Sequence, residues 1–356
     1  MKSHRGNRPR SIGGRKPVGL ALQGGGSWGA YTWGVLDTLL DNPDLAITQL
    51  SGTSAGAINA AIVASALANG SRRHARAALA SFWRRIADPA AAELLRSLLG
   101  PVGRYWRDSL SDWLLAGTAF NVAGAQALGV HPLRDAVAEH VDIAAIRSDS
   151  SPALFVTVTH VQTGLPRVIS NDAMSIDALL ASACLPHLFP SVEIDGESYW
   201  DGGYAGNPTL WPMIRSGLAD DLLLVQLVPE RIDAPPRDTP SIRRRVGEIV
   251  FNASLVAEMQ ALATVRELAA RVGANSRATD VRMHRIGPPR AELFGKGSGV
   301  DRGLAWLQRL RDEGAAAGQH FIEEHGADLG VRETLDITRF APAVARHSDS
   351  PRPLSN

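Results

Sequence analysis

"LALQGGGSWGAYTWGVLDTLL" occupies residues 20–40, and its glycines decide which kind of α/β protein the chain forms. The apolar residues before the glycines predict a buried strand over 17–22, and the helically spaced apolar residues after them predict a helix. Gly24, Gly26 and Gly29 fit the G-x-G-x-x-G pattern of dinucleotide-binding proteins. A glycine loop between a strand and a helix can equally present backbone N–H groups to the oxyanion of an acyl-transfer reaction.

The second predicted strand, residues 47–50, separates these two interpretations. A dinucleotide site needs an acidic residue near the end of this strand to hold the ribose hydroxyls, but neither the strand nor the helix predicted after it contains one. Residues 52–56 instead read G-T-S-A-G, a G-x-S-x-G sequence in the strand-to-helix context of a nucleophile elbow. Because Gly52 and Gly56 permit the tight turn, Ser54 is the candidate nucleophile.

A serine nucleophile also needs a base, and the strongest candidate in the sequence is Asp201. It ends a predicted strand and precedes Gly202 and Gly203, so its carboxylate can point from a glycine turn into a cleft. None of the ten histidines lies in a recognisable triad sequence. His160, at the end of a predicted strand, and His187 are the alternatives, and a structural or surface role is expected for both.

Three stretches, taken together and in this order, resemble the patatin-like phospholipase family over roughly residues 17–215. They are QGGGSWGAYTWGVL (23–36), SGTSAGAINA (51–60) and ASACLPHLFPSVEIDGESYWDGGYAGNP (181–208). Each motif is common alone, whereas the combination is specific. The resemblance implies a mostly parallel sheet in a three-layer α/β/α arrangement.

The resemblance also implies an activity and the residues that perform it. The chain is expected to be a lipid acyl hydrolase that cleaves carboxylic esters through a Ser–Asp dyad without a catalytic histidine. Ser54 would be the nucleophile, Asp201 the general base, and Gly24, Gly25 and Gly26 the oxyanion loop. Neither a metal nor a cofactor is expected, since the sequence contains no metal-binding cluster.

Some alternatives stay open at this point. A thioesterase or an acyltransferase shares the first half-reaction of the dyad, and a catalytically weak lipid-binding or scaffold protein could keep the same fold. A dinucleotide-binding protein is the remaining alternative from another class. Trp28 stands where family members often carry Arg or Lys, which favours a neutral ester or an acyl chain over a phospholipid headgroup.

The composition is that of an ordinary globular protein. The chain has 356 residues, 45% of them hydrophobic, and a net charge of +1, so nothing indicates a nucleic-acid partner. The single cysteine, Cys184, excludes an internal disulfide. The N-terminus lacks a signal-peptide pattern and no apolar run is long enough to span a bilayer, so we expect a cytoplasmic location and at most peripheral membrane contact.

The predicted organisation has four parts. They are a disordered basic tail (1–16), a catalytic domain (17–230) with a helical insertion (about 72–147), a helical extension (231–340) packed on that domain, and a disordered tail (341–356). The insertion carries aromatic residues, including Trp106 and Trp113, expected mostly in the core, although segment 88–130 could also line an acyl-chain groove. A long amphipathic helix is predicted over 242–272. Its apolar face comprises Ile242, Val246, Ile249, Ala253 and Val256.

Overall fold

The computed structural model of the chain describes residues 13–87, 133–186, 189–288 and 303–340. In these ranges eight strands form one mixed sheet in the order β5-β6-β3-β2-β1-β7-β8, with β4 paired to β3 off this path. Neighbouring strands among β1, β2, β3, β7 and β8 are parallel, while β4 and β6 run antiparallel to β3, and β5 to β6. The strands are β1 (Lys16–Leu22), β2 (Leu45–Gly52), β3 (Ala153–His160), β4 (Pro166–Ser170), β5 (Val192–Ile194), β6 (Glu197–Asp201), β7 (Asp221–Val225) and β8 (Arg282–Ile286).

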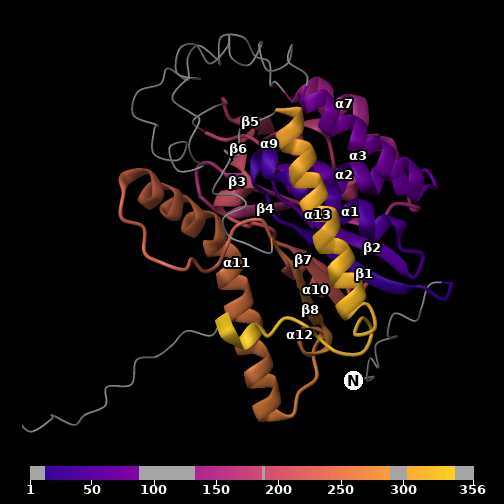
Figure 1. Cartoon of the computed structure of the whole chain (residues 1–356), viewed down its shortest axis with the longest axis vertical. Coiled ribbons are helices and arrows are strands. Elements are labelled where there is room, and N and C mark those ends of the chain that lie inside the picture. Colours follow the sequence, from indigo (N-terminus) through magenta and orange to yellow (C-terminus); the bar gives the residue numbers. More distant parts are fainter. Residues whose placement is uncertain (1–12, 88–132, 187–188, 289–302, 341–356) are drawn as a thin grey trace, which may run out of the picture.

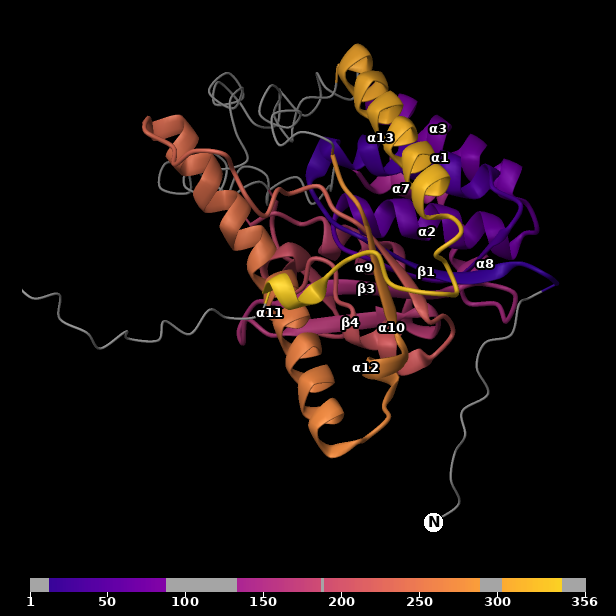
Figure 2. The same ribbon diagram turned by 60° about the horizontal axis from the view of Figure 1, so that its bottom comes forward.

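Helices cover both faces of this sheet. Figure 2 shows α1, α2, α3 and α13 on one side of the strands, and α10, α11 and α12 on the other. The helices are α1 (Gly29–Asp41), α2 (Ala55–Ala68), α3 (Arg72–Ala87), α7 (Arg134–His140), α8 (Ile143–Ile146), α9 (Ile176–Ser182), α10 (Trp211–Ser216), α11 (Thr239–Val272), α12 (Arg277–Asp280) and α13 (Leu304–His325) (Figure 1).

The alternation of side chains along the central strand β1 explains the three layers. Val18, Leu20 and Leu22 are fully buried in the core cluster that contains the apolar residues of α1, α2 and α13. Ala21 points to the opposite face and belongs to a second cluster with residues of α10 and α11. A strand buried on both faces is typical of a parallel sheet between two helical layers, so the predicted α/β/α fold is confirmed.

Most of the predicted elements occur, and one ends earlier than predicted. The apolar run over 221–229 predicts a buried strand, but β7 stops at Val225, because the N–H groups of Leu227 and Val228 both donate to the side-chain Oε1 of Gln23. The stretch VEIDGESYWDGG (192–203) predicts a hairpin with Asp195 and Gly196 at its turn, and β5 and β6 form this hairpin. Strand β4 was not predicted.

Several predictions fall on residues outside the described ranges. These are His187, the aromatic residues Trp106 and Trp113 with their segment 88–130, residues 1–12 of the N-terminal tail, and the C-terminal tail 341–356. Residues 13–16 of the predicted N-terminal tail are described, and Lys16 is already the first residue of β1. Among the helices in the described ranges, none has the length and hydropathy needed to cross a bilayer.

Helix α13 of the C-terminal part packs closely against α1, the helix that follows the glycine loop. A Cβ atom at Gly34 would lie 1.8 Å from the carbonyl oxygen of Arg311, and one at Gly314 would lie 2.0 Å from that of Tyr31. Two glycines therefore allow the helix backbones to touch where they cross, which anchors the element that starts at the glycine loop.

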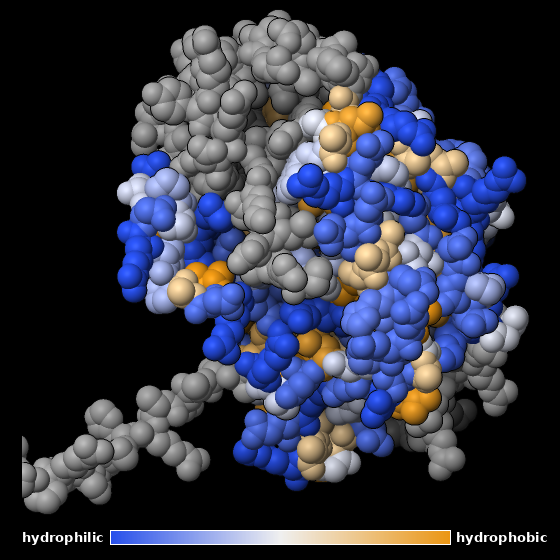
Figure 3. Space-filling view, in the orientation of Figure 1, coloured by the Kyte–Doolittle hydropathy of each residue, from blue (hydrophilic) through white to orange (hydrophobic). Residues whose placement is uncertain are grey.

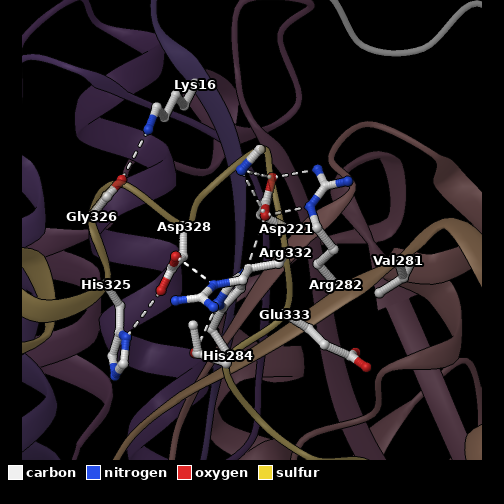
Figure 4. Close-up of polar contacts among 12 residues, drawn as sticks. Lys16, Asp221, Val281, Arg282, His284, His325, Gly326, Asp328, Arg332 and Glu333 are labelled. Carbon is white, nitrogen blue, oxygen red and sulfur yellow. Dashed lines mark hydrogen bonds and ion pairs between the residues drawn. The ribbon is translucent and has the colours of Figure 1, made fainter.

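The amino edge of the sheet carries a polar cavity of about 920 Å³. Its lining includes the first residues of three strands, Lys16, Asp221 and Arg282. Figure 4 shows how its charges are paired: the guanidinium of Arg282 donates to both oxygens of the buried Asp221, at 2.8 and 2.7 Å. His284 Nε2 lies 3.0 Å from Asp221 Oδ1, and the N–H of Gly330 donates to the same carboxylate. The Asp221 carboxylate thus links the C-terminal segment, through Gly330, to strands β7 and β8.

Candidate active site

Strand β3 brings the two candidate catalytic residues together. Strand β4 occupies one edge of β3, so β2 and β6, whose pairings with β3 overlap that of β4, must share the other edge. On this edge β2 ends at Gly52 opposite Val156, and β6 ends at Asp201 opposite Val158. The two strands therefore end towards each other, and Ser54, two residues beyond Gly52, lies in the turn beside Asp201.

The turn after β2 has the strained geometry of a nucleophile elbow. Ser54 adopts φ 55° and ψ −127° immediately before α2, a region that residues with a Cβ atom rarely occupy, and it is only 5% exposed. A Cβ at Gly52 would lie 2.6 Å from the carbonyl oxygen of Gly56, and one at Gly56 would lie 2.2 Å from that of Leu22. Both flanking glycines are thus required by the close approach of strand, turn and helix.

Ser182, at the end of α9, fixes the main chain of this turn. Its Oγ accepts a hydrogen bond from the Ser54 N–H at 3.0 Å and donates one to the carbonyl oxygen of Thr157 at 2.7 Å. Sequence reasoning did not single out this residue. The available signal was a hydroxyl side chain in a short helix that is otherwise apolar on its buried side.

Asp201 is fully buried at the end of β6. Its Oδ1 accepts the N–H of Gly203 at 2.8 Å, and its own N–H donates to the carbonyl oxygen of Cys184 at 2.7 Å. Its Oδ2 has no hydrogen bond of normal geometry within the described residues. One carboxylate oxygen is therefore held in place and the other is available for a proton.

Burial raises the pKa of Asp201 to about 7, although the Gly203 N–H and the Ser54 side chain both act to lower it. The Ser54 hydroxyl therefore interacts with the carboxyl group even without a fully formed hydrogen bond, and such contacts tighten when substrate binds. A carboxyl group with this pKa is a stronger base than an exposed one and is still ionised in a large fraction of molecules at neutral pH.

Cys184 does not compete as a nucleophile. Burial, with the charge of Asp201 as a second cause, raises the pKa of its thiol to about 12. The thiol therefore stays protonated at neutral pH, and only a thiolate reacts readily.

The glycine loop after β1 lies against the elbow. A Cβ atom at Gly24 would be 2.8 Å from that of Ser54. The Gly24 N–H already donates to Oδ1 of Asn207 at 2.7 Å. The N–H groups of Gly25 and Gly26, by contrast, donate to no acceptor in the described part of the chain, and Gly26 has a positive φ of 60°.

Asn207 links the glycine loop to helix α11, which lies outside the three motifs. Its side chain is fully buried; besides accepting the Gly24 N–H, it donates from Nδ2 to the carbonyl oxygen of Phe251 at 3.2 Å. Its main-chain N–H donates to Ser254 Oγ at 3.2 Å. The residue follows the D-G-G turn by four positions, so a single polypeptide segment carries both the base and the support of the loop.

Gln23, the residue before the glycines, makes a second link to α11. It is fully buried, and its Nε2 donates to Asn252 Oδ1 at 2.8 Å, while its Oε1 accepts the N–H groups of Leu227 and Val228. Asn252 in turn donates to the carbonyl oxygen of Val228 at 3.3 Å. The end of β7, the start of the glycine loop and α11 are thus joined by one buried polar network.

Aromatic residues pack against the D-G-G turn and the glycine loop. Phe251 packs on Gly203, where a Cβ would meet its ring at 2.5 Å, and makes an edge-on contact with Tyr204. Trp28 is 2% exposed and packs beneath Gly25. The surroundings of the loop are therefore apolar at the position where family members often carry a cation.

His160, the alternative base that lies within the described ranges, is bonded away from this site. His160 Nε2 lies 3.0 Å from Glu197 Oε2, and its Nδ1 lies 3.0 Å from Thr163 Oγ1. Across the described ranges, no hydrogen bond joins a histidine to Ser54 or Asp201. The same ranges contain no group of three or more His, Cys, Asp or Glu side chains placed to hold a metal ion.

A serine in a nucleophile elbow at the carboxyl edge of a mainly parallel sheet is typical of α/β hydrolytic enzymes, and here a buried carboxyl group lies beside it. The sequence model described as patatin-like phospholipase matches residues 20–214, and the chain belongs to that family of lipid acyl hydrolases. Among solved structures, VipD from Legionella pneumophila aligns over 88% of this chain and 68% of its own, with 15% identity and a TM-score of 0.43. Comparison with curated proteins gave no match.

Proposed function

We propose that this chain cleaves carboxylic esters of lipids through an acyl-enzyme on Ser54, with Asp201 as the general base. The observation that carries the proposal is the buried Asp201 carboxyl group beside a strained serine. The pKa of Asp201 is about 7, and within the described residues its Oδ2 has no hydrogen bond of normal geometry. Backbone strain persists where the surrounding structure imposes it, and such positions cluster at active sites. The strained conformation of Ser54 places its hydroxyl group beside the Asp201 carboxylate.

In the acylation step, Ser54 Oγ forms a bond to the ester carbonyl carbon while its proton passes to Asp201 Oδ2. The carbonyl π electrons move to oxygen and form a tetrahedral oxyanion. When the intermediate collapses, the bond from carbon to the leaving oxygen breaks, and Asp201 returns the proton to the departing alcohol. The products of this step are an acyl-serine and an alcohol or lysolipid.

Deacylation repeats the sequence with water. Asp201 accepts a proton from the attacking water molecule, whose oxygen bonds to the acyl carbon. Collapse of the second tetrahedral intermediate breaks the bond to Ser54 Oγ, which receives the proton back, and a fatty acid is released. One carboxyl group therefore serves as base and acid in both halves.

The N–H groups of Gly25 and Gly26 are the proposed oxyanion donors. Gly24 contributes differently, because its N–H is occupied by Asn207 and its missing side chain lets the loop approach Ser54. Removing one such donor typically costs about 10²–10³ in kcat. Because the Gly24 N–H is occupied, the loop offers the N–H groups of Gly25 and Gly26, which suit the single oxygen of an oxyanion better than a pyrophosphate.

The experiment compares the wild-type enzyme with Ser54→Ala on p-nitrophenyl esters, acylglycerols, phosphatidylcholine and acyl-CoA, together with labelling by a fluorophosphonate. We expect Ser54→Ala to fold normally and to lose both hydrolysis and labelling. Substantial activity in the variant would reject Ser54. A wild-type protein that neither hydrolyses any ester nor takes up the label would be a binding protein, and one that cleaves only acyl-CoA would be a thioesterase.

A further inference from the structure

The first half of α11 carries an apolar stripe on its outer side. Ile242, Val246, Ile249 and Val250 are 46%, 41%, 54% and 39% exposed. Their spacing places them on one side of the helix over a little more than two turns. The sequence predicts an apolar face that includes Ile242, Val246 and Ile249, and in the structure these three side chains are exposed, whereas Val256 of the predicted face packs against the second core cluster. Figure 3 shows hydrophobic side chains emerging among hydrophilic ones over α11.

The opposite side of the same helical half borders the candidate active site. Phe251 packs on Gly203 and Asn252 donates to the network around Gln23. The buried residues of this half are Gly247, Glu248, Phe251, Asn252 and Leu255. A surface that met the outer stripe would therefore lie one helix diameter away from the catalytic loops.

The stripe is accompanied by positive charge. Three consecutive arginines, Arg243 to Arg245, precede Val246, and Glu248 is the only acidic residue between Thr239 and Val256 in the sequence. Glu248 is buried and paired with Arg245 at 3.1 Å. An apolar stripe flanked by arginines is the pattern of a helix that lies in the interface of an anionic lipid surface.

We propose that this outer face of α11, made of Ile242, Val246, Ile249 and Val250 with Arg243 and Arg244 beside them, docks on anionic lipid surfaces. Arg245 is excluded from the face because it is bonded to Glu248 and to the carbonyl oxygens of Pro229 and Glu230. The inference rests on the proposed function, because lipid esters are presented in such surfaces. A second copy of the chain fits the face less well. Four partly exposed aliphatic side chains offer far less than the roughly 800 Å² per partner that a stable protein interface buries.

The test measures co-sedimentation with phosphatidylcholine vesicles, with and without phosphatidylglycerol, in a Ser54→Ala background so that no lipid is consumed. Ile249→Asp is compared with Leu268→Asp, because both residues lie on α11 and both are 54% exposed. We expect binding to increase with phosphatidylglycerol, to decrease with salt, and to weaken roughly tenfold or more in Ile249→Asp only. Circular dichroism checks that both variants fold.

Three results would overturn the proposal. The first is that the parent protein does not bind vesicles. The second is that the Ile249→Asp and Leu268→Asp variants bind vesicles equally well. The third is that the protein self-associates and that only Ile249→Asp abolishes this, which would assign the face to a second copy of the chain. Failure of the proposed function is seen separately. Vesicle binding is measured without catalysis, whereas hydrolysis of a soluble short-chain ester depends on Ser54 and should survive both aspartate substitutions.

Discussion

Ser54 and Asp201 are each held in a state that the isolated residue avoids. The φ of 55° at Ser54 costs about 1–3 kcal/mol for a residue with a side chain. Asp201 is fully buried, and its partners in the described part of the chain, Gly203 and Ser54, carry no positive charge. Neighbouring contacts impose both states: Ser182 holds the Ser54 N–H, and Gly203 holds one carboxylate oxygen. The chemistry at the residue scale follows from this enforced pairing.

The pH dependence of kcat/KM should report the buried carboxyl group. Because Asp201 must be ionised to accept a proton and burial raises its pKa to about 7, activity should fall about tenfold per pH unit below neutrality. The measurement is a pH series on a soluble ester with a non-ionising leaving group. An acidic limb near the ordinary pKa of aspartate would show that the base is solvated and that this account of its environment is wrong.

Asp201→Asn should make the protein more stable at alkaline pH. The pKa of Asp201 is raised from 3.8 to about 7 on folding, so the wild-type protein loses stability as pH rises through this range, on the order of 4 kcal/mol in all. An asparagine side chain does not titrate, so the variant does not lose this stability as the pH rises. Thermal unfolding at about pH 5 and about pH 8 should show a gain for the variant that is larger at the higher pH, and an equal difference at both would contradict the shift.

At the scale of elements, α11 acts on the glycine loop from outside the matched family segment. The contacts Gln23–Asn252 and Asn207–Phe251 cross 229 and 44 positions of sequence. The elbow could be predicted because strand, glycine spacing and serine are local in sequence. The residues that support it, Ser182 and Asn252, could not, because a buried polar side chain reveals its partner only once the chain has folded.

Asn252→Ala should lower kcat more than it changes KM. Without its Oδ1, Gln23 Nε2 loses an acceptor at the base of the glycine loop, and a small displacement of oxyanion donors can cost up to about 10²-fold in rate. Kinetics on a soluble ester measure this, and Asn252→Asp, which keeps the acceptor, should restore part of kcat.

Leu262→Ala is the matched control on the same helix. Leu262 is 1% exposed and lies in the core cluster away from the loop, so its truncation should cost about 2–5 kcal/mol of stability without lowering kcat of the folded enzyme. Equal kcat values for the Asn252 and Leu262 variants would mean that α11 supports the fold alone.

At the scale of the whole molecule, the two edges of the sheet serve different purposes. The carboxyl edge holds Ser54 and Asp201, while the amino edge holds the charged cavity in which Asp221 joins β7, β8 and the C-terminal segment (Figure 4). The α/β class and its three layers could be predicted, because fully apolar strands separated by helices leave few other arrangements. The orientation of the apolar face of α11 could not, since periodicity does not tell whether a face meets the core or a partner.

Asp221→Asn should reduce stability without affecting catalysis. Burial alone would raise the pKa of Asp221, but the bonds from Arg282, His284 and Gly330 outweigh it and hold the pKa well below its usual range. The stabilisation is therefore present above the unfolded pKa near 4 and is lost as pH falls below it. Breaking such a buried pair costs about 3–5 kcal/mol. Thermal unfolding at neutral pH checks the loss of stability, and kcat/KM checks that catalysis is unaffected. A lower kcat/KM in the folded variant would contradict the second statement, because it would show that the amino edge of the sheet influences the active site at the carboxyl edge.

The most direct measurement of the central claim is kcat/KM for Asp201→Asn and His160→Ala, side by side on one soluble short-chain ester. The account predicts a loss of about 10²–10⁴ for Asp201→Asn, because the amide keeps the shape but cannot take the serine proton. It predicts near-wild-type activity for His160→Ala, whose ring is bonded to Glu197 and Thr163 instead of the site. A folded Asp201→Asn enzyme that keeps most of its activity, or an inactive but folded His160→Ala enzyme, would contradict a Ser54–Asp201 dyad.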